Sequence, residues 1–265
     1  MRDEADLRRE MVRIGRLLYE RQLIIAAEGN LSVALGGGFF LVTPAGLCKG
    51  LLAESDLLVV DAQGAPRQPA AGRPSSEWPL HREIYQTRPQ TGAVCHAHPP
   101  WATAFAVARE PLDGCVLPEV VTTLGAVPLA AYATPGTDEV PRAARRLLAE
   151  GHQALLLANH GVVTLAADLA EAFFHLEAVE RLAQVTLLAR LLGGEQRLGA
   201  REVGALRRAA AASLPACRPD GAGQALNRRP APPSEPGERG ATAQLVLETL
   251  AGRIAGAILA ELGRR

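Results

Sequence analysis

The chain has 265 residues, 48% of them hydrophobic, and its 28 basic residues balance its 28 acidic residues. This length and apolar content allow one substantial core with room for an appendage. The zero formal net charge gives no reason to expect nucleic acid or an anionic membrane as a partner. We read the densely charged N-terminus as neither a signal peptide nor a membrane helix, and we therefore expect a cytoplasmic protein.

The first elements alternate helix and strand. Apolar residues at helical spacing predict a helix over residues 4–22. Two strands, Leu31–Leu35 and Phe39–Val42, flank three consecutive glycines and indicate a hairpin, and Leu57–Asp61 predicts another strand.

Two short polar segments accompany this hairpin. In the first, Gly29 permits a close backbone approach, while Asn30 and Ser32 offer hydrogen bonds to an anion; a plain turn explains these residues equally well. The second runs from Thr43 to Gly46 directly after a strand.

Ser75, Ser76 and Glu77 precede a predicted helix in which Pro79 falls in the first turn. One interpretation is an N-cap followed by an acidic first turn. The other is an anion site, because hydroxyls and free amides at a helix start hold phosphate, with the carboxylate acting as a base or metal ligand.

Three histidines lie at predicted strand ends. His96 and His98 are two residues apart on an extended chain, so both imidazoles project from one face while Cys95 faces away. His160 follows the apolar strand 154–158. Three imidazoles with one open position suit a catalytic Zn²⁺, although Mn²⁺, Co²⁺ and Fe²⁺ also accept such ligands. His152 and His175 are in a loop and mid-helix, and we do not expect them to be ligands.

The remaining elements complete a predicted three-layer α/β/α sandwich around a mixed, mostly antiparallel sheet. They are helices Ala102–Ala108, Pro141–Gly151 and Asp168–Leu192, and short strands Leu112–Pro118 and Val127–Leu129. Four cysteines lie apart without a CxxC pair, and we expect reduced thiols at Cys48, Cys95, Cys115 and Cys217.

Several short motifs, in one order over roughly residues 5–192, resemble the class II aldolase/adducin family, and most closely its aldolases of fuculose phosphate. They are Gly29-Asn30-Leu31-Ser32, Thr43-Pro44-Ala45-Gly46, Ser75-Ser76-Glu77-Trp78, His96-Ala97-His98-Pro99, Tyr132-Ala133-Thr134-Pro135-Gly136-Thr137 and Asn159-His160-Gly161. The resemblance implies the same sandwich fold, assembled as a homotetramer.

The resemblance also implies a metal-dependent aldolase that cleaves a sugar 1-phosphate to dihydroxyacetone phosphate and a small aldehyde through a zinc-stabilised enediolate. It implies one Zn²⁺ on His96, His98 and His160, with Glu77 as proton shuttle and ligand of the empty site. It further implies a phosphate site at Gly29, Asn30, Ser32, Thr43, Gly46, Ser75 and Ser76. The composition agrees, since a Schiff-base aldolase needs an apolar-pocket lysine and Lys49, the only lysine, lies in a glycine-flanked loop.

The chain departs from the family pattern in the tyrosines that serve the aldehyde. Glu119 stands where one would fall, either as a substitute acid or as a solvated residue. Sugar-phosphate epimerases of the family place aspartate at the position of Glu77, and a dehydratase remains an alternative. A non-catalytic adducin-like interaction module is another, although a scaffold has no use for an assembled metal site.

We divide the chain into a catalytic domain at 1–192, a tail and disordered linker at 193–240, and an amphipathic helix at 241–265. The linker is rich in Pro, Gly, Ala and Arg. The terminal helix resembles the encapsulation peptides that bind shell proteins of bacterial microcompartments, which would place the protein in the microcompartment lumen. Alternatively, this helix packs on its own oligomer.

Overall fold

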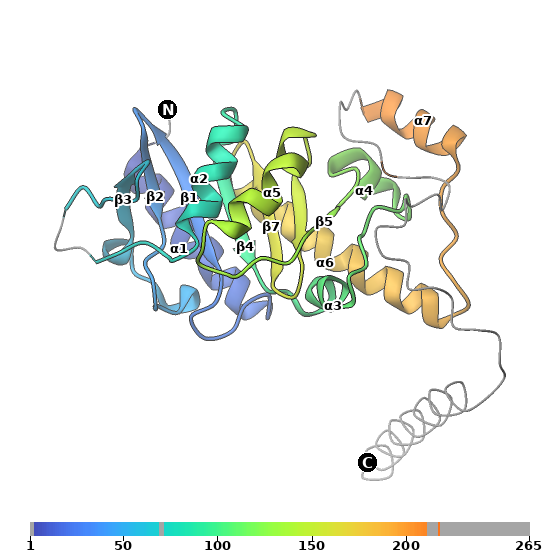
Figure 1. Ribbon diagram of the computed structural model, residues 1–265, viewed down its shortest axis with the longest axis horizontal. Coiled ribbons are helices and arrows are strands. Elements are labelled where there is room, and N and C mark those ends of the chain that lie inside the picture. Colours follow the sequence, from blue (N-terminus) through green and yellow to red (C-terminus); the bar gives the residue numbers. More distant parts are fainter. Residues whose placement is uncertain (1–2, 69–71, 211–216, 218–265) are drawn as a thin grey trace, which may run out of the picture. The chain divides into compact units, whose positions relative to one another are not determined.

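A seven-stranded sheet forms the centre of the computed structural model, which describes residues 3–68, 72–210 and 217 (Figure 1). The strand order is β3-β2-β1-β4-β7-β6-β5. Only β5 and β6 pair in parallel, so the predicted mixed, mostly antiparallel sheet is confirmed. The strands are β1 (Asn30–Gly36), β2 (Phe39–Val42), β3 (Leu58–Asp61), β4 (Ala93–Ala97), β5 (Leu129–Ala130), β6 (Ala154–Leu157) and β7 (Gly161–Ala166).

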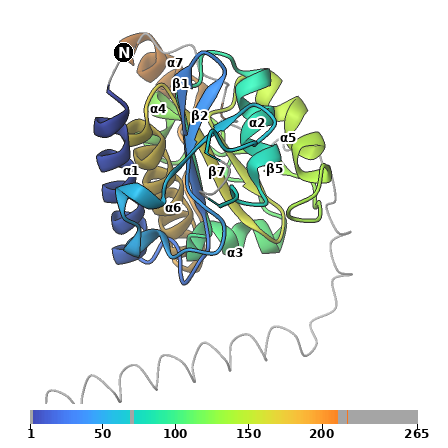
Figure 2. The same ribbon diagram turned by 90° about the vertical axis from the view of Figure 1, so that its left-hand side faces the viewer.

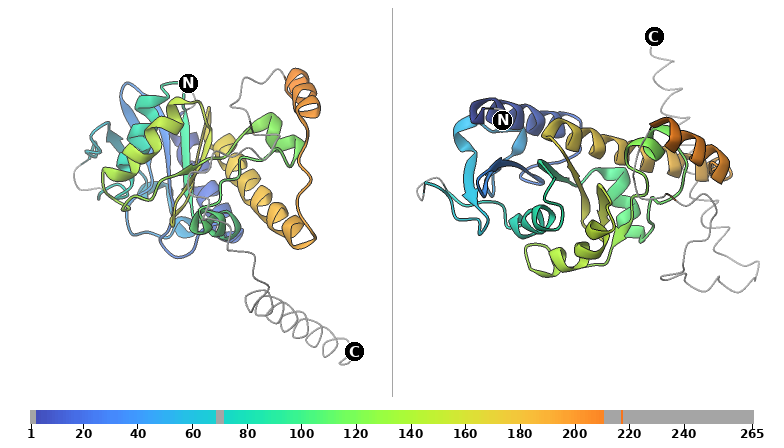
Figure 3. Two further views of the ribbon diagram at one scale, coloured as in Figure 1. Left: turned by 45° about the vertical axis from the view of Figure 1, so that its right-hand side comes forward. Right: turned by 90° about the horizontal axis from the view of Figure 1, so that it is seen from above.

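Helices cover both faces of this sheet, which confirms the three-layer sandwich. The two longest, α1 and α6, lie on one face, and α2 and α5 lie on the other (Figures 2 and 3). The helices are α1 (Glu4–Glu20), α2 (Trp78–Thr87), α3 (Pro100–Ala108), α4 (Pro118–Thr123), α5 (Glu139–Ala149), α6 (Leu169–Leu191) and α7 (Ala200–Ala210). Short 3₁₀ turns, η1 (Lys49–Leu51) and η2 (Glu54–Asp56), follow β2.

Strand β4 separates two hydrophobic cores. Ala93, Cys95 and Ala97 pack with residues of α1 and α6, whereas Val94 packs with residues of α2 and α5. This alternation is the two-residue period of an extended chain. It places His96 on the side of α2 and leaves Cys95 fully buried on the opposite side, and the sequence predicts that these two residues face opposite ways.

Two local expectations were inaccurate. Strand β7 was not predicted, and it pairs with β6 as a hairpin around His160. The strand expected at Leu112–Pro118 was wrong: Leu112 forms only an isolated bridge with Val127, and Pro118 begins helix α4. Proline suits this first helical position because its φ is already helical and no backbone N–H is needed there.

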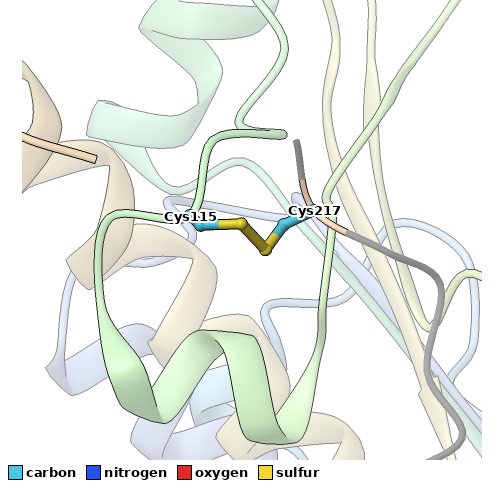
Figure 4. The surroundings of a disulfide bond; sticks show 2 residues. All are labelled: Cys115 and Cys217. Atoms are coloured by element: carbon cyan, nitrogen blue, oxygen red, sulfur yellow. A yellow bond between two sulfur atoms is a disulfide. The ribbon is translucent and has the colours of Figure 1, made fainter. Parts of the chain in front are cut away.

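The expectation of four reduced cysteines was also wrong. Cys115 and Cys217 form a disulfide across a sequence separation of 102, with their Cα atoms 5.4 Å apart (Figure 4). Both pack in a small third core with Val121 and Val203, against helix α7, which stands where a tail was expected. Spacing along the chain does not reveal a pair that only tertiary structure brings together.

Most of the predicted linker and the whole predicted helix at 241–265 lie outside the described residues. Within the residues that are described, no helix combines the length and apolar character that crossing a membrane requires.

The disulfide should stabilise the fold. Because it closes a loop of about a hundred residues, the double substitution Cys115→Ser/Cys217→Ser should lower the free energy of unfolding by about 2–4 kcal/mol. Guanidinium unfolding monitored by circular dichroism measures this loss. Cys48→Ser, at a half-buried free thiol, is the matched control and should be neutral. Equal midpoints for the double variant and the wild type, both without reductant, would contradict the prediction.

Candidate active site

Glu77, His96, His98 and His160 meet at one point beside the sheet. One ligand atom from each lies within 4.8 Å of all the others. His96 is on β4 and His98 just beyond it, His160 is in the turn between β6 and β7, and Glu77 is the residue immediately before α2. The sequence prediction named these four residues, and the structure brings all of them together.

The separations between the ligand atoms suit one small metal ion. His96 Nε2 lies 3.2 Å from His98 Nε2, and the two carboxylate oxygens of Glu77 lie 3.1 Å from His96 Nε2 and His160 Nε2. A tetrahedral Zn²⁺ with bonds of about 2.0–2.1 Å separates its ligands by about 3.3–3.4 Å. The donor set, three imidazoles and a carboxylate, is also one that Zn²⁺ accepts.

An orphaned oxygen supports this fit. Glu77 Oε1 is buried, and no hydrogen bond from the described residues reaches it, although His160 Nε2 is 3.1 Å away. A buried carboxylate oxygen without a donor is costly. A cation held between Glu77 and the imidazoles removes that cost.

Each histidine has different contacts behind it. His96 Nδ1 donates to the Val162 carbonyl oxygen at 2.8 Å, which leaves Nε2 of the neutral ring free to ligate. His98 Nδ1 faces Glu28 Oε2 at 3.4 Å, and that oxygen accepts from the Ile25 N–H. His160 Nδ1 is buried without a hydrogen-bond partner among the described residues.

The charges within the cluster are strongly coupled. Burial raises the pKa of the Glu77 carboxyl, but the adjacent imidazoles of His96 and His160 outweigh burial and hold it well below its usual range. Burial lowers the pKa of His96, yet the Glu77 carboxylate reverses this and raises it. Burial, with His96 and His160 nearby, lowers the pKa of His98 to about 4. Glu77 is therefore ionised and His98 neutral near pH 7, the states that metal ligation requires.

Two glycines allow the strands to approach this closely. A Cβ at Gly161 would lie 2.5 Å from the Ala97 carbonyl oxygen and 2.6 Å from the His98 ring. Gly29 has φ +68°, and a Cβ there would lie 2.8 Å from the His96 carbonyl oxygen. Gly29 thus has a structural role beneath β4, whatever it contributes to an anion site.

The residues predicted to hold phosphate are only partly gathered. Asn30, Ser32, Thr43 and Ser75 line one small pocket, whose cavity volume is about 10 Å³. Ser76 and Gly46 are exposed outside it. The Thr43 hydroxyl already accepts from the Leu31 N–H at 3.1 Å, and Ser75 Oγ accepts from the Glu77 N–H at 3.3 Å.

Sequence reasoning missed His81, which is 2% exposed on α2. Its ring lies 2.6 Å from Ser32 Oγ and 2.5 Å from Asn30 Oδ1. Ser32 Oγ also contacts the Tyr85 hydroxyl at 2.8 Å, and Asn30 Nδ2 donates to Glu77 Oε2 at 2.7 Å. Glu77, His81 and Tyr85 recur every four residues, so one helix face carries all three, and this spacing was the available signal.

Other candidate residues lie outside the cluster. Lys49 is buried, with Nζ donating to the carbonyl oxygens of Ala27 and Leu47, and burial lowers its pKa. Glu119 is exposed in the first turn of α4. His152 and His175 each face a backbone carbonyl oxygen at 3.1 Å and, as expected, are not part of the four-residue group.

Known proteins are similar to this chain in fold and in sequence. The family model for the class II aldolase and adducin N-terminal domain matches residues 9–187. An L-fuculose phosphate aldolase of Methanococcus maripaludis is 31% identical over 179 residues, covering 68% of this chain and 95% of the relative. A 3-oxo-tetronate 4-phosphate decarboxylase of Escherichia coli K12 is 35% identical over 189 residues, covering 70% of this chain and 88% of the relative.

The solved structures agree with these relatives. A structure of L-fuculose 1-phosphate aldolase superposes with a TM-score of 0.70 at 36% identity, covering 77% of this chain and 95% of that one. The match of the family model to most of the chain, together with these relatives, establishes that the chain belongs to the class II aldolase and adducin N-terminal domain family.

Proposed function

We propose that this protein is a zinc-dependent aldehyde-lyase that cleaves a sugar 1-phosphate into dihydroxyacetone phosphate and a small aldehyde. The observation that carries the proposal is the convergence of Glu77, His96, His98 and His160 on one point. The similarity to fuculose phosphate aldolases supports the substrate class. The assembled cluster argues against a purely structural, adducin-like role, because burying a carboxylate among imidazoles is costly without a function.

The metal would be held by His96, His98 and His160, with Glu77 as the fourth ligand of the resting site. When bound, the ion supplies Lewis-acid stabilisation of negative charge on substrate oxygens. The chain's own part is to orient the imidazoles. His96 Nδ1 is fixed by a backbone carbonyl, and His98 Nδ1 faces the Glu28 carboxylate.

Glu77 would move the proton. In cleavage, the bond between the triose phosphate carbon and the aldehyde carbon breaks, and its electron pair stays on the triose phosphate. The ionised Glu77 carboxylate takes up the proton that the hydroxyl loses as it becomes the aldehyde carbonyl, and the Glu77 carboxyl then gives a proton to the triose phosphate carbon, so that protons balance. In the reverse direction the Glu77 carboxylate removes the same carbon-bound proton.

The phosphate site is proposed at the turn that precedes α2. Ser75 and Ser76 would supply hydroxyls and backbone amides at a helix start. Ser75 shares a pocket with Thr43, whereas Ser76 and Gly46 would reach the phosphate from outside that pocket. Gly29 and Asn30 would contribute through their backbone. The side chains of Asn30 and Ser32 are already hydrogen-bonded to Glu77 and His81, so we assign them a supporting part in holding the phosphate.

A decarboxylase is the second candidate function. It is favoured by the 35% identity to the 3-oxo-tetronate 4-phosphate decarboxylase. Decarboxylation of such a 3-oxo acid also breaks a carbon–carbon bond next to a carbonyl carbon, so the same Lewis acid would stabilise the charge. The dehydratase alternative is supported in the same way, by 32% identity over 194 residues to a methylthioribulose-1-phosphate dehydratase of Sorangium cellulosum. The epimerase alternative is proposed from the family resemblance.

The proposed assembly is a homotetramer. Leu51, Leu191 and Leu192 are 80%, 61% and 90% exposed. Single exposed apolar side chains are common on monomers, so the homotetramer is proposed from the family resemblance. Docking of the 241–265 helix on a microcompartment shell stays a prediction, since the helix lies outside the described residues.

A panel of phosphorylated substrates tests the reaction. The zinc-loaded protein should release dihydroxyacetone phosphate and aldehyde from fuculose 1-phosphate or related ketose 1-phosphates, and chelation should abolish this release. Coupled reduction of the triose phosphate measures cleavage, and carbon dioxide evolution measures decarboxylation. Release of carbon dioxide from a 4-phosphorylated 3-oxo acid, with no cleavage of any ketose phosphate, would favour the second candidate.

Substitution of Glu77 tests its role in the reaction. Glu77→Gln keeps the shape but removes the base, so turnover should fall by at least about 100-fold. Elemental analysis should still find bound zinc, because three imidazoles remain. Loss of metal together with activity would show that Glu77 is chiefly a ligand.

The Glu28 carboxylate, which faces His98 Nδ1, should affect the affinity for the metal. Glu28→Gln removes the charge that faces His98 Nδ1 and should weaken zinc binding about tenfold or more. Competition with a chromophoric chelator measures the affinity. Glu54→Gln, at an exposed residue of η2, is the control and should leave the affinity unchanged. Equal affinities for Glu28→Gln and the wild type would remove Glu28 from the site.

A further inference from the structure

We propose that His81 is a positioning residue that locks the Asn30 amide in the orientation that holds Glu77. The inference rests on the proposed function, because Glu77 is the group being positioned. It concerns four hydrogen bonds that link Tyr85, Ser32, His81, Asn30 and Glu77 in that order.

Donor and acceptor chemistry fixes the direction of the two hydrogen bonds nearest Glu77. An ionised carboxylate only accepts, so the atom of Asn30 that lies 2.7 Å from Glu77 Oε2 is its NH₂ group. The amide oxygen of Asn30 then faces His81 Nε2 at 2.5 Å. An amide oxygen only accepts, so His81 carries a proton on Nε2.

The directions of the other two hydrogen bonds follow from the neutral His81 ring. Burial and the nearby His96 together lower the pKa of His81 to about 3, against the opposing effect of Glu77, so the ring bears a single proton. With Nε2 protonated, Nδ1 accepts from the Ser32 hydroxyl at 2.6 Å. Ser32 Oγ in turn accepts from Tyr85 at 2.8 Å, and burial raises the pKa of Tyr85, so it retains its proton. Each of the four hydrogen bonds therefore has a defined donor and a defined acceptor.

The network joins α2 to β1 directly beneath the metal ligands. Glu77, His81 and Tyr85 lie on one face of the helix, and Asn30 and Ser32 project from one face of the strand. Asn30 on β1 is the antiparallel partner of His96 on the neighbouring strand β4. If the Asn30 amide turned over, its oxygen would oppose the Glu77 carboxylate, so the N–H of His81 selects the productive rotamer.

The competing explanation is that His81 only fills space in the core. Two substitutions distinguish this packing role from the positioning role. His81→Gln supplies an amide N–H near the position of Nε2, whereas His81→Phe fills the space with no donor. We expect His81→Phe to lower kcat about 100-fold with little change in KM, because a small displacement of a catalytic group has that effect. His81→Gln should stay within about tenfold of wild type.

Two readouts do not depend on turnover. Zinc affinity should fall about tenfold in His81→Phe and stay close to wild type in His81→Gln, since loss of a supporting hydrogen bond weakens a ligand. Nitrogen NMR of the zinc-loaded wild type should show His81 protonated at Nε2 and unprotonated at Nδ1 between about pH 6 and pH 9. His175→Phe, at another buried histidine, which faces a backbone carbonyl oxygen and the Glu171 carboxylate outside the cluster, controls for a lost imidazole.

The outcomes distinguish this inference from the proposed function. Equal losses in His81→Phe and His81→Gln, or an Nδ1-protonated ring, would overturn the positioning role. A wild-type protein that binds zinc, shows the expected tautomer and loses metal affinity only in His81→Phe would support that role. If the same protein cleaved no sugar phosphate, the proposed function alone would fail.

Discussion

The antiparallel pairing of β4 with β1 on one side and β7 on the other is the constraint on which the site depends. It sets His96 opposite Asn30 and Val163, and it brings the β6–β7 turn with His160 next to His98. Gly161 permits this contact because its missing Cβ leaves room for the His98 ring. Helix α2 then needs only to cross this face to place Glu77 between the imidazoles.

Much of this arrangement could be predicted from local sequence patterns. The two-residue period of a strand predicts that His96 and His98 share a face and that Cys95 does not, and the structure agrees. The apolar run before His160 predicts its position at a strand end. The three-layer fold follows from the alternation of helices and strands, and a recurring set of short motifs pointed to the family.

What the sequence did not reveal depends on contacts between distant segments. His81 has no motif of its own, and its importance appears only when Asn30 and Ser32 lie beside it. The disulfide joins residues separated by 102 positions, and no local pattern marks it. The strand expected at Leu112–Pro118 failed because a strand needs a continuous ladder with a partner, whereas Leu112 pairs with Val127 through an isolated bridge and Pro118 already begins α4.

The disulfide also extends the folded unit beyond the family match. The match to the family stops at residue 187, yet Cys115 lies inside that range and its partner Cys217 lies thirty residues beyond it. A chain shortened to the family boundary would keep the whole metal cluster but leave an unpaired thiol, and would lose Val203 and Cys217 from the small third core. Such a chain would gain a route to covalent cross-linking between copies, so the smallest independent unit of this protein is longer than its catalytic motifs indicate.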